Sequence, residues 1–123
     1  MIAATRPGQT WAEALAAGQA AYRETGFDGE WREHVQGGPI GYLSREFDVV
    51  PGTAGAAQTI AAGTAFAWNP SVRGAKSEDT FVAGLSGPVP VTNTADWPVL
   101  PGGRPAILHV ASFLAVWRFT RHG

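Results

Sequence analysis

Residues 10–26 read TWAEALAAGQAAYRETG and carry the clearest structural pattern in the chain. Thr10 and Glu13 form a capping-box pattern, in which each side chain satisfies a free backbone donor of the other residue. Apolar or small residues recur at helical spacing and give one apolar face, namely Trp11, Ala14, Leu15, Gly18 and Tyr22. Thr25-Gly26 supplies the stop, because glycine accepts the left-handed cap conformation. The stretch predicts one amphipathic helix over about residues 11 to 24.

A second stretch, residues 64–83, predicts two strands joined by a tight turn. Residues 64–68 read TAFAW, and Asn69-Pro70 ends this strand. Arg73-Gly74 suits a tight turn, and residues 77–83 supply the return strand. We therefore expect an antiparallel hairpin here.

Glycine and proline interrupt the segments on either side. Residues 30–50 contain GGPIG at 37–41, which suits short strands meeting at a glycine-rich bend, and residues 51–55, PGTAG, read as a turn. Repeated prolines make residues 88–105 extended and irregular. The apolar residues 107–119 fit either a strand or a helix. A helix followed by several strands predicts an α+β fold.

The composition sets the class of protein. A length of 123 residues suits one domain, so we treat residues 1–123 as a single unit. Apolar residues make up 45% of the chain and charged residues 15%, which argues against disorder and indicates surface that another chain or segment covers. A net charge of -1, with no block of like charges, gives nucleic acid no electrostatic footprint. The absence of cysteine excludes disulfides, thiolate metal sites and a cysteine nucleophile.

Membrane insertion and secretion are not expected from this sequence. The longest apolar run, residues 106–117, is too short to span a bilayer. The first six residues lack the apolar core of a signal peptide. We therefore expect a cytoplasmic protein.

Two segments carry more than a generic α+β pattern. Residues 30–42 read EWREHVQGGPIGY and are followed by Arg45-Glu46, and residues 66–80 read FAWNPSVRGAKSEDT. In that order and at that spacing they resemble the third and the last two ligand-bearing segments of the pita-bread hydrolases, the family of methionine aminopeptidase, Xaa-Pro dipeptidase and creatinase. They are most similar to a bacterial subgroup of Xaa-Pro aminopeptidase-like proteins. The resemblance runs over about residues 8 to 108, leaves residues 109–123 as a tail of unassigned origin, and corresponds to about half of a catalytic domain in that family. It implies half of a pita-bread domain, with one or two helices packed on a curved antiparallel sheet.

The resemblance also implies a ligand set. The family holds a pair of Mn, Co or Zn ions with two aspartates from its N-terminal half and one histidine and two glutamates from its C-terminal half, and these ions generate hydroxide for attack on an amide. The last ligand lies in a basic-x-Glu-Asp motif, which matches KSED at residues 76–79 and places Glu78 in the ligand position. Val35 stands at the place of the ligand histidine and Asn69 at that of the penultimate glutamate. His34 is displaced by one residue, which on a strand turns the side chain to the other face. We therefore expect no resident metal; Mn, Co or Zn would be expected only if the family site were complete.

The same resemblance implies catalytic positions at His34, Tyr42 and Lys76 and substrate-binding positions at Trp68 and Arg45.

Each of these residues also has a plainer interpretation. Glu78-Asp79 fits a solvated acid pair at the end of a strand, and His34 fits a strand histidine bonded to a backbone carbonyl. Tyr42, Arg45 and Glu46 fit an exposed ion pair beside a core tyrosine, and the tryptophans fit packing.

Three functions remain open at this point. The chain is a truncated or degenerate Xaa-Pro aminopeptidase-like protein that is catalytically silent alone, a peptidase or amide hydrolase half-site completed by another chain or by dimerisation, or a non-catalytic peptide- or protein-binding module. The half-site has a metal-free form, because creatinase belongs to the resembled family and works without metal. In that form His34 is the general base and Glu78 orients the substrate.

The expected partner is a second copy of the chain or a complementary N-terminal half. The seam between the two halves of the complete fold is apolar, and an exposed apolar patch is normally covered. The apolar tail is expected to contribute to this contact through Phe113, Leu114, Trp117 and Phe119. No nucleic-acid or membrane partner is expected.

Overall fold

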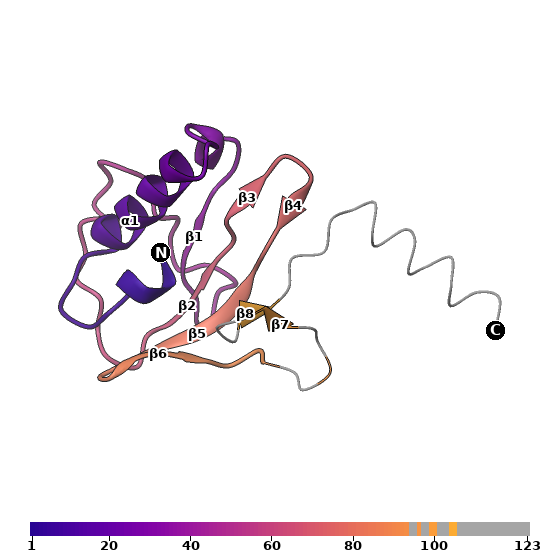
Figure 1. The fold of residues 1–123 in the computed structure, drawn as a ribbon. Helices are drawn as coiled ribbons and strands as arrows, with labels where there is room; N and C mark the ends of the chain where they lie inside the picture. The colour runs from indigo at the N-terminus through magenta and orange to yellow at the C-terminus, as the bar shows by residue number, and fades with distance from the viewer. Residues whose placement is uncertain (94–95, 97–98, 101–103, 106–123) are drawn as a thin grey trace.

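The fold is a small α+β arrangement, as the sequence predicts. The computed structural model describes residues 1–93, 96, 99–100 and 104–105. Helix α1 lies against a four-stranded antiparallel sheet of order β1-β2-β5-β6, and β3 and β4 form a hairpin beyond its end (Figure 1). Strands β7 and β8 pair separately with each other. The elements in chain order are η1 (Ile2–Ala4), α1 (Trp11–Glu24), η2 (Glu30–Arg32), β1 (Gly37–Pro39), β2 (Ala65–Trp68), β3 (Ser71–Val72), β4 (Ala75–Lys76), β5 (Asp79–Gly84), β6 (Gly87–Pro90), β7 (Val99–Leu100) and β8 (Arg104–Pro105).

Helix α1 begins and ends where the sequence predicts. The backbone N–H of Thr10 donates to Glu13 Oε2 at 2.7 Å, and the N–H of Glu13 donates to Thr10 Oγ1 at 3.2 Å, so the capping box is complete. Two further free donors of the first turn reach a distant loop, since the N–H of Trp11 donates to the carbonyl of Gln58 at 3.2 Å and the N–H of Ala12 to that of Ala56 at 2.8 Å. The loop at residues 56–60 therefore fixes the helix against the rest of the domain.

Strands β2 to β5 form one long hairpin that bends in the middle. β2 pairs with β5 through Phe66 opposite Phe81, and β3 pairs with β4 through Val72 opposite Ala75. The turn between β3 and β4 uses Gly74 at a φ of 88°, a conformation that favours glycine. The predicted hairpin and its Arg73-Gly74 turn are confirmed.

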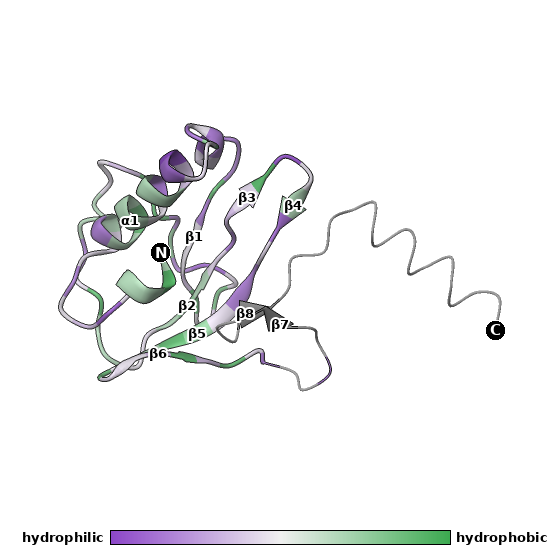
Figure 2. Ribbon diagram, viewed as in Figure 1, coloured by the Kyte–Doolittle hydropathy of each residue, from purple (hydrophilic) through white to green (hydrophobic). Residues whose placement is uncertain are grey.

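The core lies between α1 and one face of the sheet. Along β2 and β5 every second side chain points to the helix, so Phe66 and Phe81 are buried while Ala67 and Val82 lie on the other face. Trp11 of α1 contacts the rings of Phe66 and Trp68, with ring centroids 6.2 Å apart in both pairs. Figure 2 shows that β5 is hydrophilic next to the β3–β4 hairpin and hydrophobic next to β6. The buried cluster consists of Trp11, Ala14, Leu15, Val49, Ala56, Ile60, Phe66, Trp68, Phe81 and Ala83.

Two expectations for the glycine- and proline-rich segments were wrong. Gly37–Pro39, expected as a bend, is strand β1, and it pairs with β2 in the register Gly37 opposite Trp68. Gly37 is required there, because its φ is 120° and a Cβ atom would collide with the carbonyl oxygen of Ala67. Residues 88–90, expected as extended and irregular, are extended, but they belong to a regular strand, β6 (Gly87–Pro90). The predicted turn at residues 51–55 is confirmed.

The apolar stretch at residues 107–119, expected as a strand or a helix, lies outside the described residues. Among the helices of the described part, none has the length and apolar composition needed to cross a membrane.

Candidate functional site

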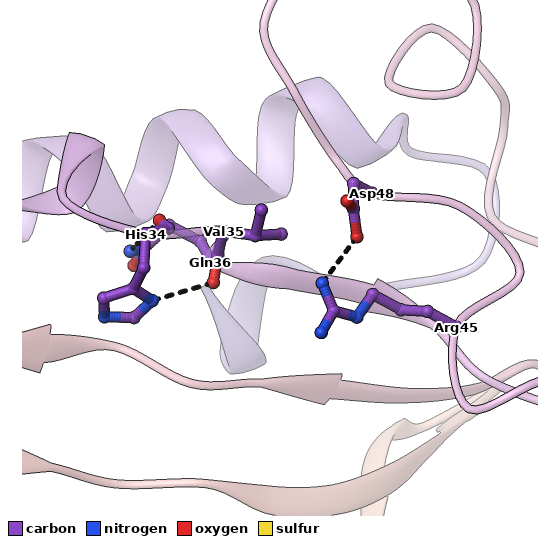
Figure 3. A network of polar contacts seen from close by, with 5 residues as sticks. All are labelled: His34, Val35, Gln36, Arg45 and Asp48. Atoms are coloured by element: carbon purple, nitrogen blue, oxygen red, sulfur yellow. Dashed lines mark hydrogen bonds and ion pairs between the residues drawn. The ribbon is translucent and has the colours of Figure 1, made fainter.

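His34 lies on a bend between η2 and β1 rather than on a strand. Its side chain is exposed, and Nδ1 lies 2.9 Å from the carbonyl oxygen of Val35, the next residue (Figure 3). The tautomer that carries the proton on Nδ1 donates to this carbonyl. The bond to a backbone carbonyl that the plainer interpretation expects is therefore present, although the strand is not.

Tyr42 and Arg45 lie in the loop that follows β1. Tyr42 is 106% exposed, so it is not the core tyrosine of the plainer interpretation. Arg45 Nη1 lies 2.7 Å from Asp48 Oδ1 in an exposed ion pair (Figure 3). The partner of Arg45 is thus Asp48 and not Glu46.

Lys76 and Glu78 are the two candidates that the fold brings together. Lys76 ends β4 and Glu78 stands just before β5, with Lys76 Nζ 2.8 Å from Glu78 Oε2. Both side chains are about half exposed. A pair in such a position is stabilising by no more than about 1 kcal/mol, because water and salt screen it.

Trp68 is part of the core. It ends β2, is 1% exposed, and donates from Nε1 to Thr5 Oγ1 at 2.9 Å. Thr5 is also fully buried and passes the hydrogen bond on to the carbonyl of Met1 at 3.1 Å. Trp68 therefore packs the domain, and one part of its surface reaches the groove described below.

The candidate residues do not converge on one site. Within the described residues, the Lys76–Glu78 pair is the single hydrogen bond or ion pair that joins two of them. No group of three or more His, Asp or Glu side chains that could hold a metal gathers in the described part of the chain.

A buried polar network lies beside His34, and the sequence motifs did not predict it. Gln36 is 3% exposed, and its amide nitrogen donates to the carbonyls of Trp31 at 3.0 Å and His34 at 3.1 Å. Its amide oxygen lies 3.0 Å from the hydroxyl of Tyr22 on α1. The same hydroxyl accepts from the N–H of Ser71 at 2.7 Å and lies 2.8 Å from the carbonyl of Ser71. Tyr22 and Gln36 thus tie together α1, the segment before β1, and β3.

Burial also changes the ionisation of Tyr22. Removal of its phenol from water raises the pKa of Tyr22, and this outweighs the hydrogen bonds with Ser71 and Gln36, which lower the pKa. The hydroxyl therefore stays neutral and serves as donor and acceptor at neutral pH.

Asn69, the residue after β2, completes the network. With its amide nitrogen facing them, Asn69 donates to the carbonyl oxygens of Val35 at 2.8 Å and Gln36 at 3.0 Å. Its backbone N–H donates to the carbonyl of Gln36 at 2.9 Å as well. The side chain at the place of the family's penultimate glutamate is therefore a donor to the backbone.

One feature of the sequence, the tyrosine on the apolar face of the predicted helix, indicates a buried polar contact. An apolar helix face that includes a tyrosine implies a buried hydroxyl, and a buried hydroxyl needs a partner. The identity of that partner depends on which strands pair, and single residues do not reveal it.

Two hollows flank the network. An apolar groove of about 270 Å³ lies between α1 and the β3–β4 hairpin, with Gly18, Ala21 and Ala75 among its walls. A more polar hollow of about 600 Å³ lies between η2 and β3 and includes His34, Glu30 and Glu33. In the second hollow Glu30 Oε2 already accepts the backbone N–H of Arg73 at 2.8 Å.

Comparison of the chain with protein families, with curated proteins and with solved structures found no match. The resemblance to the pita-bread hydrolases therefore depends on residues 30–46 and 66–80 alone.

Proposed function

We propose that this chain is a catalytically silent domain with the sequence pattern of the C-terminal half of a pita-bread hydrolase. The observation that carries the proposal is the position of the Asn69 amide against the carbonyl oxygens of Val35 and Gln36, which its nitrogen can satisfy as a donor and its oxygen cannot. A metal ligand must present a lone pair, and an amide that ties two backbone segments together serves a structural role instead.

The other candidate groups support the same proposal. Glu78, the third residue of the KSED motif, pairs with Lys76 at 2.8 Å on the surface. The imidazole of His34 has a backbone carbonyl at 2.9 Å and faces solvent. Amide hydrolysis requires an activated water together with a group that stabilises the developing oxyanion, and both must address one carbon atom. Groups dispersed over a bend, a loop and a hairpin do not meet that requirement.

The activity test is a panel of Xaa-Pro dipeptides with and without added Mn or Co, run beside Glu78→Ala. We expect no turnover from either protein. Turnover that disappears in Glu78→Ala would refute the proposal and favour the half-site that is completed by another chain or by dimerisation. Turnover that persists in Glu78→Ala would identify a contaminating peptidase. Both proteins would then be repurified to constant specific activity and assayed again, to show whether turnover is absent or depends on Glu78.

A binding module is the second candidate function, and the groove between α1 and the β3–β4 hairpin favours it. The polar side chains on its walls already use their hydrogens within the domain: Thr25 Oγ1 donates to the carbonyl of Ala21 at 2.7 Å, and Ser71 Oγ to that of Asn69 at 3.1 Å. Such a groove offers shape and apolar surface, and ligand sites are commonly of this kind.

A fluorescent apolar probe such as anilinonaphthalene sulfonate tests this second function. Ala21→Trp places a large side chain in the groove, whereas Ala16→Trp adds the same side chain elsewhere on the exposed surface of α1. We expect the probe to bind wild type and Ala16→Trp and to lose affinity for Ala21→Trp. Equal binding by all three proteins would exclude the groove as the site.

A further inference from the structure

The two edges of the four-stranded sheet are closed in different ways. β1 and β6 are the edge strands, because the order is β1-β2-β5-β6. At β1 the outward carbonyls of Gly37 and Pro39 accept the N–H groups of Val49 at 3.1 Å and Glu46 at 3.0 Å. Residues 46–49 therefore cover that edge. At β6, no described strand pairs with the outer side.

The register of β6 shows which of its residues face outward. Phe81 lies opposite Pro90 and Ala83 opposite Pro88. In an antiparallel ladder, successive residues direct their N–H and C=O groups alternately to the two neighbouring strands. The N–H of Val91 donates to the carbonyl of Thr80 at 2.9 Å, so Val91 faces β5, and Val89, two residues earlier, faces β5 as well. Pro88 and Pro90 consequently occupy both outward positions of the strand.

Proline has no backbone N–H, so the outer edge of β6 presents acceptors without donors. A strand that approached this edge would leave its own carbonyls opposite two pyrrolidine rings. The side chains around this edge favour association with another chain, since Leu85, Val89 and Val91 are exposed and apolar. An apolar edge strand with free donors is a template for pairing with another chain.

We propose that Pro88 and Pro90 prevent β6 from pairing edge to edge with the β6 strand of a second copy of this chain. The two prolines are spaced two residues apart, which is the period of one edge of a strand. Any self-association of the wild-type domain then uses another surface.

The test restores both outward donors with Pro88→Thr/Pro90→Thr, because threonine suits strands and carries a backbone N–H. The matched control is Val89→Thr/Val91→Thr, which adds the same residues to the same strand at positions whose donors already face β5. Multi-angle light scattering gives the average mass of each protein against concentration. Amide hydrogen exchange measures protection at positions 88 and 90.

We expect the average mass of the proline variant to rise with concentration to about twofold that of wild type, as for pairing across a two-fold axis. The new amides at positions 88 and 90 should become protected as the mass rises, while the mass of the valine variant does not exceed that of wild type. A folded proline variant with the mass of wild type would overturn the proposal, as would equal association of the valine variant. If the double variant does not fold, Pro88→Thr and Pro90→Thr singly are judged by the same two readouts.

Discussion

Tyr22 and Tyr42 carry the same phenol in opposite surroundings. The hydroxyl of Tyr22 lies within 3.0 Å of Gln36 Oε1 and bonds to both backbone groups of Ser71, whereas Tyr42 is fully exposed. A buried polar atom that loses its partner costs more free energy than the hydrogen bond gained on folding. Removing the hydroxyl from Tyr22 and, separately, from Tyr42 therefore distinguishes the effect of the network from the effect of losing a hydroxyl.

Tyr22→Phe should lower the free energy of unfolding by roughly 1–3 kcal/mol, because the N–H of Ser71 and the amide oxygen of Gln36 lose their partner. Tyr42→Phe should change it by less than about 0.5 kcal/mol. Urea unfolding at neutral pH, followed by tryptophan fluorescence, measures both. Similar values for the two variants would show that the network does not stabilise the fold.

Asn69→Asp tests the donor role of Asn69 directly. The carboxylate would face the carbonyl oxygens of Val35 and Gln36, where the amide nitrogen now donates at 2.8 and 3.0 Å. We expect a loss of roughly 2–4 kcal/mol in the free energy of unfolding, from lost bonds and from repulsion between oxygens. Asn93→Asp makes the same change at an exposed position and should be nearly neutral. An Asn69→Asp protein as stable as wild type would remove the main support for the proposed function.

At the scale of the element, α1 and the β2–β5 hairpin could be predicted because their signals are local. The capping box of α1 spans four residues, and the turn of the hairpin is set by Arg73-Gly74. β1 could not be predicted, because Gly37 and Gly38 alone indicate a bend. Their place in a strand depends on the pairing with Ala67 and its neighbours in β2, which lie far away in the sequence. The same limit applies to the polar network, whose members Tyr22 and Ser71 are 49 residues apart.

The capping box makes α1 sensitive to acid. Hydrogen bonds from the backbone and side chain of Thr10 lower the pKa of Glu13 from its ordinary 4.5. A lowered pKa means that the folded state holds the charged form more strongly than the unfolded state does. The stabilisation is therefore complete above about pH 4.5 and is lost as the pH falls through the pKa of the folded state.

Glu13→Gln should lower stability at pH 7, and the difference from wild type should shrink as the pH falls below the ordinary pKa of glutamate. Glu24→Gln, at the C-terminal end of the same helix, should be neutral or slightly stabilising, because a negative charge there opposes the helix dipole. Thermal unfolding at a series of pH values measures both differences. A Glu13→Gln effect that is constant with pH would show that the charge of Glu13 has no role in the cap.

At the scale of the whole molecule, the sheet has one face against α1 and one face that no described helix covers. Val82 and Val89 are opposite each other on the second face, and Val89 is exposed. With β6 protected by proline and β1 covered by residues 46–49, this face is the surface of the sheet that remains for a second copy. The tail residues expected to contribute, Phe113, Leu114, Trp117 and Phe119, lie outside the described residues.

We therefore propose that the domain self-associates through this face. Light scattering at concentrations on the order of tens of micromolar should give a mass above that of one chain, since association depends on concentration. Val89→Glu should lower that mass by placing a charge on the face, and Ser86→Glu, which adds the same charge to the turn beside it, should not. A wild-type mass of one chain throughout that range would contradict the proposal.

Metal binding distinguishes a silent domain from a completed half-site, because the two differ first in whether Glu78 belongs to a cation site. Calorimetric titration of the full chain with Mn²⁺ and Co²⁺, beside Glu78→Ala, gives both affinity and stoichiometry. One surface carboxylate paired with Lys76 does not offset the dehydration of a divalent ion, so we expect weak heats that are the same in both proteins and no site tighter than about micromolar. A stoichiometric site tighter than that, lost in Glu78→Ala, would contradict the account.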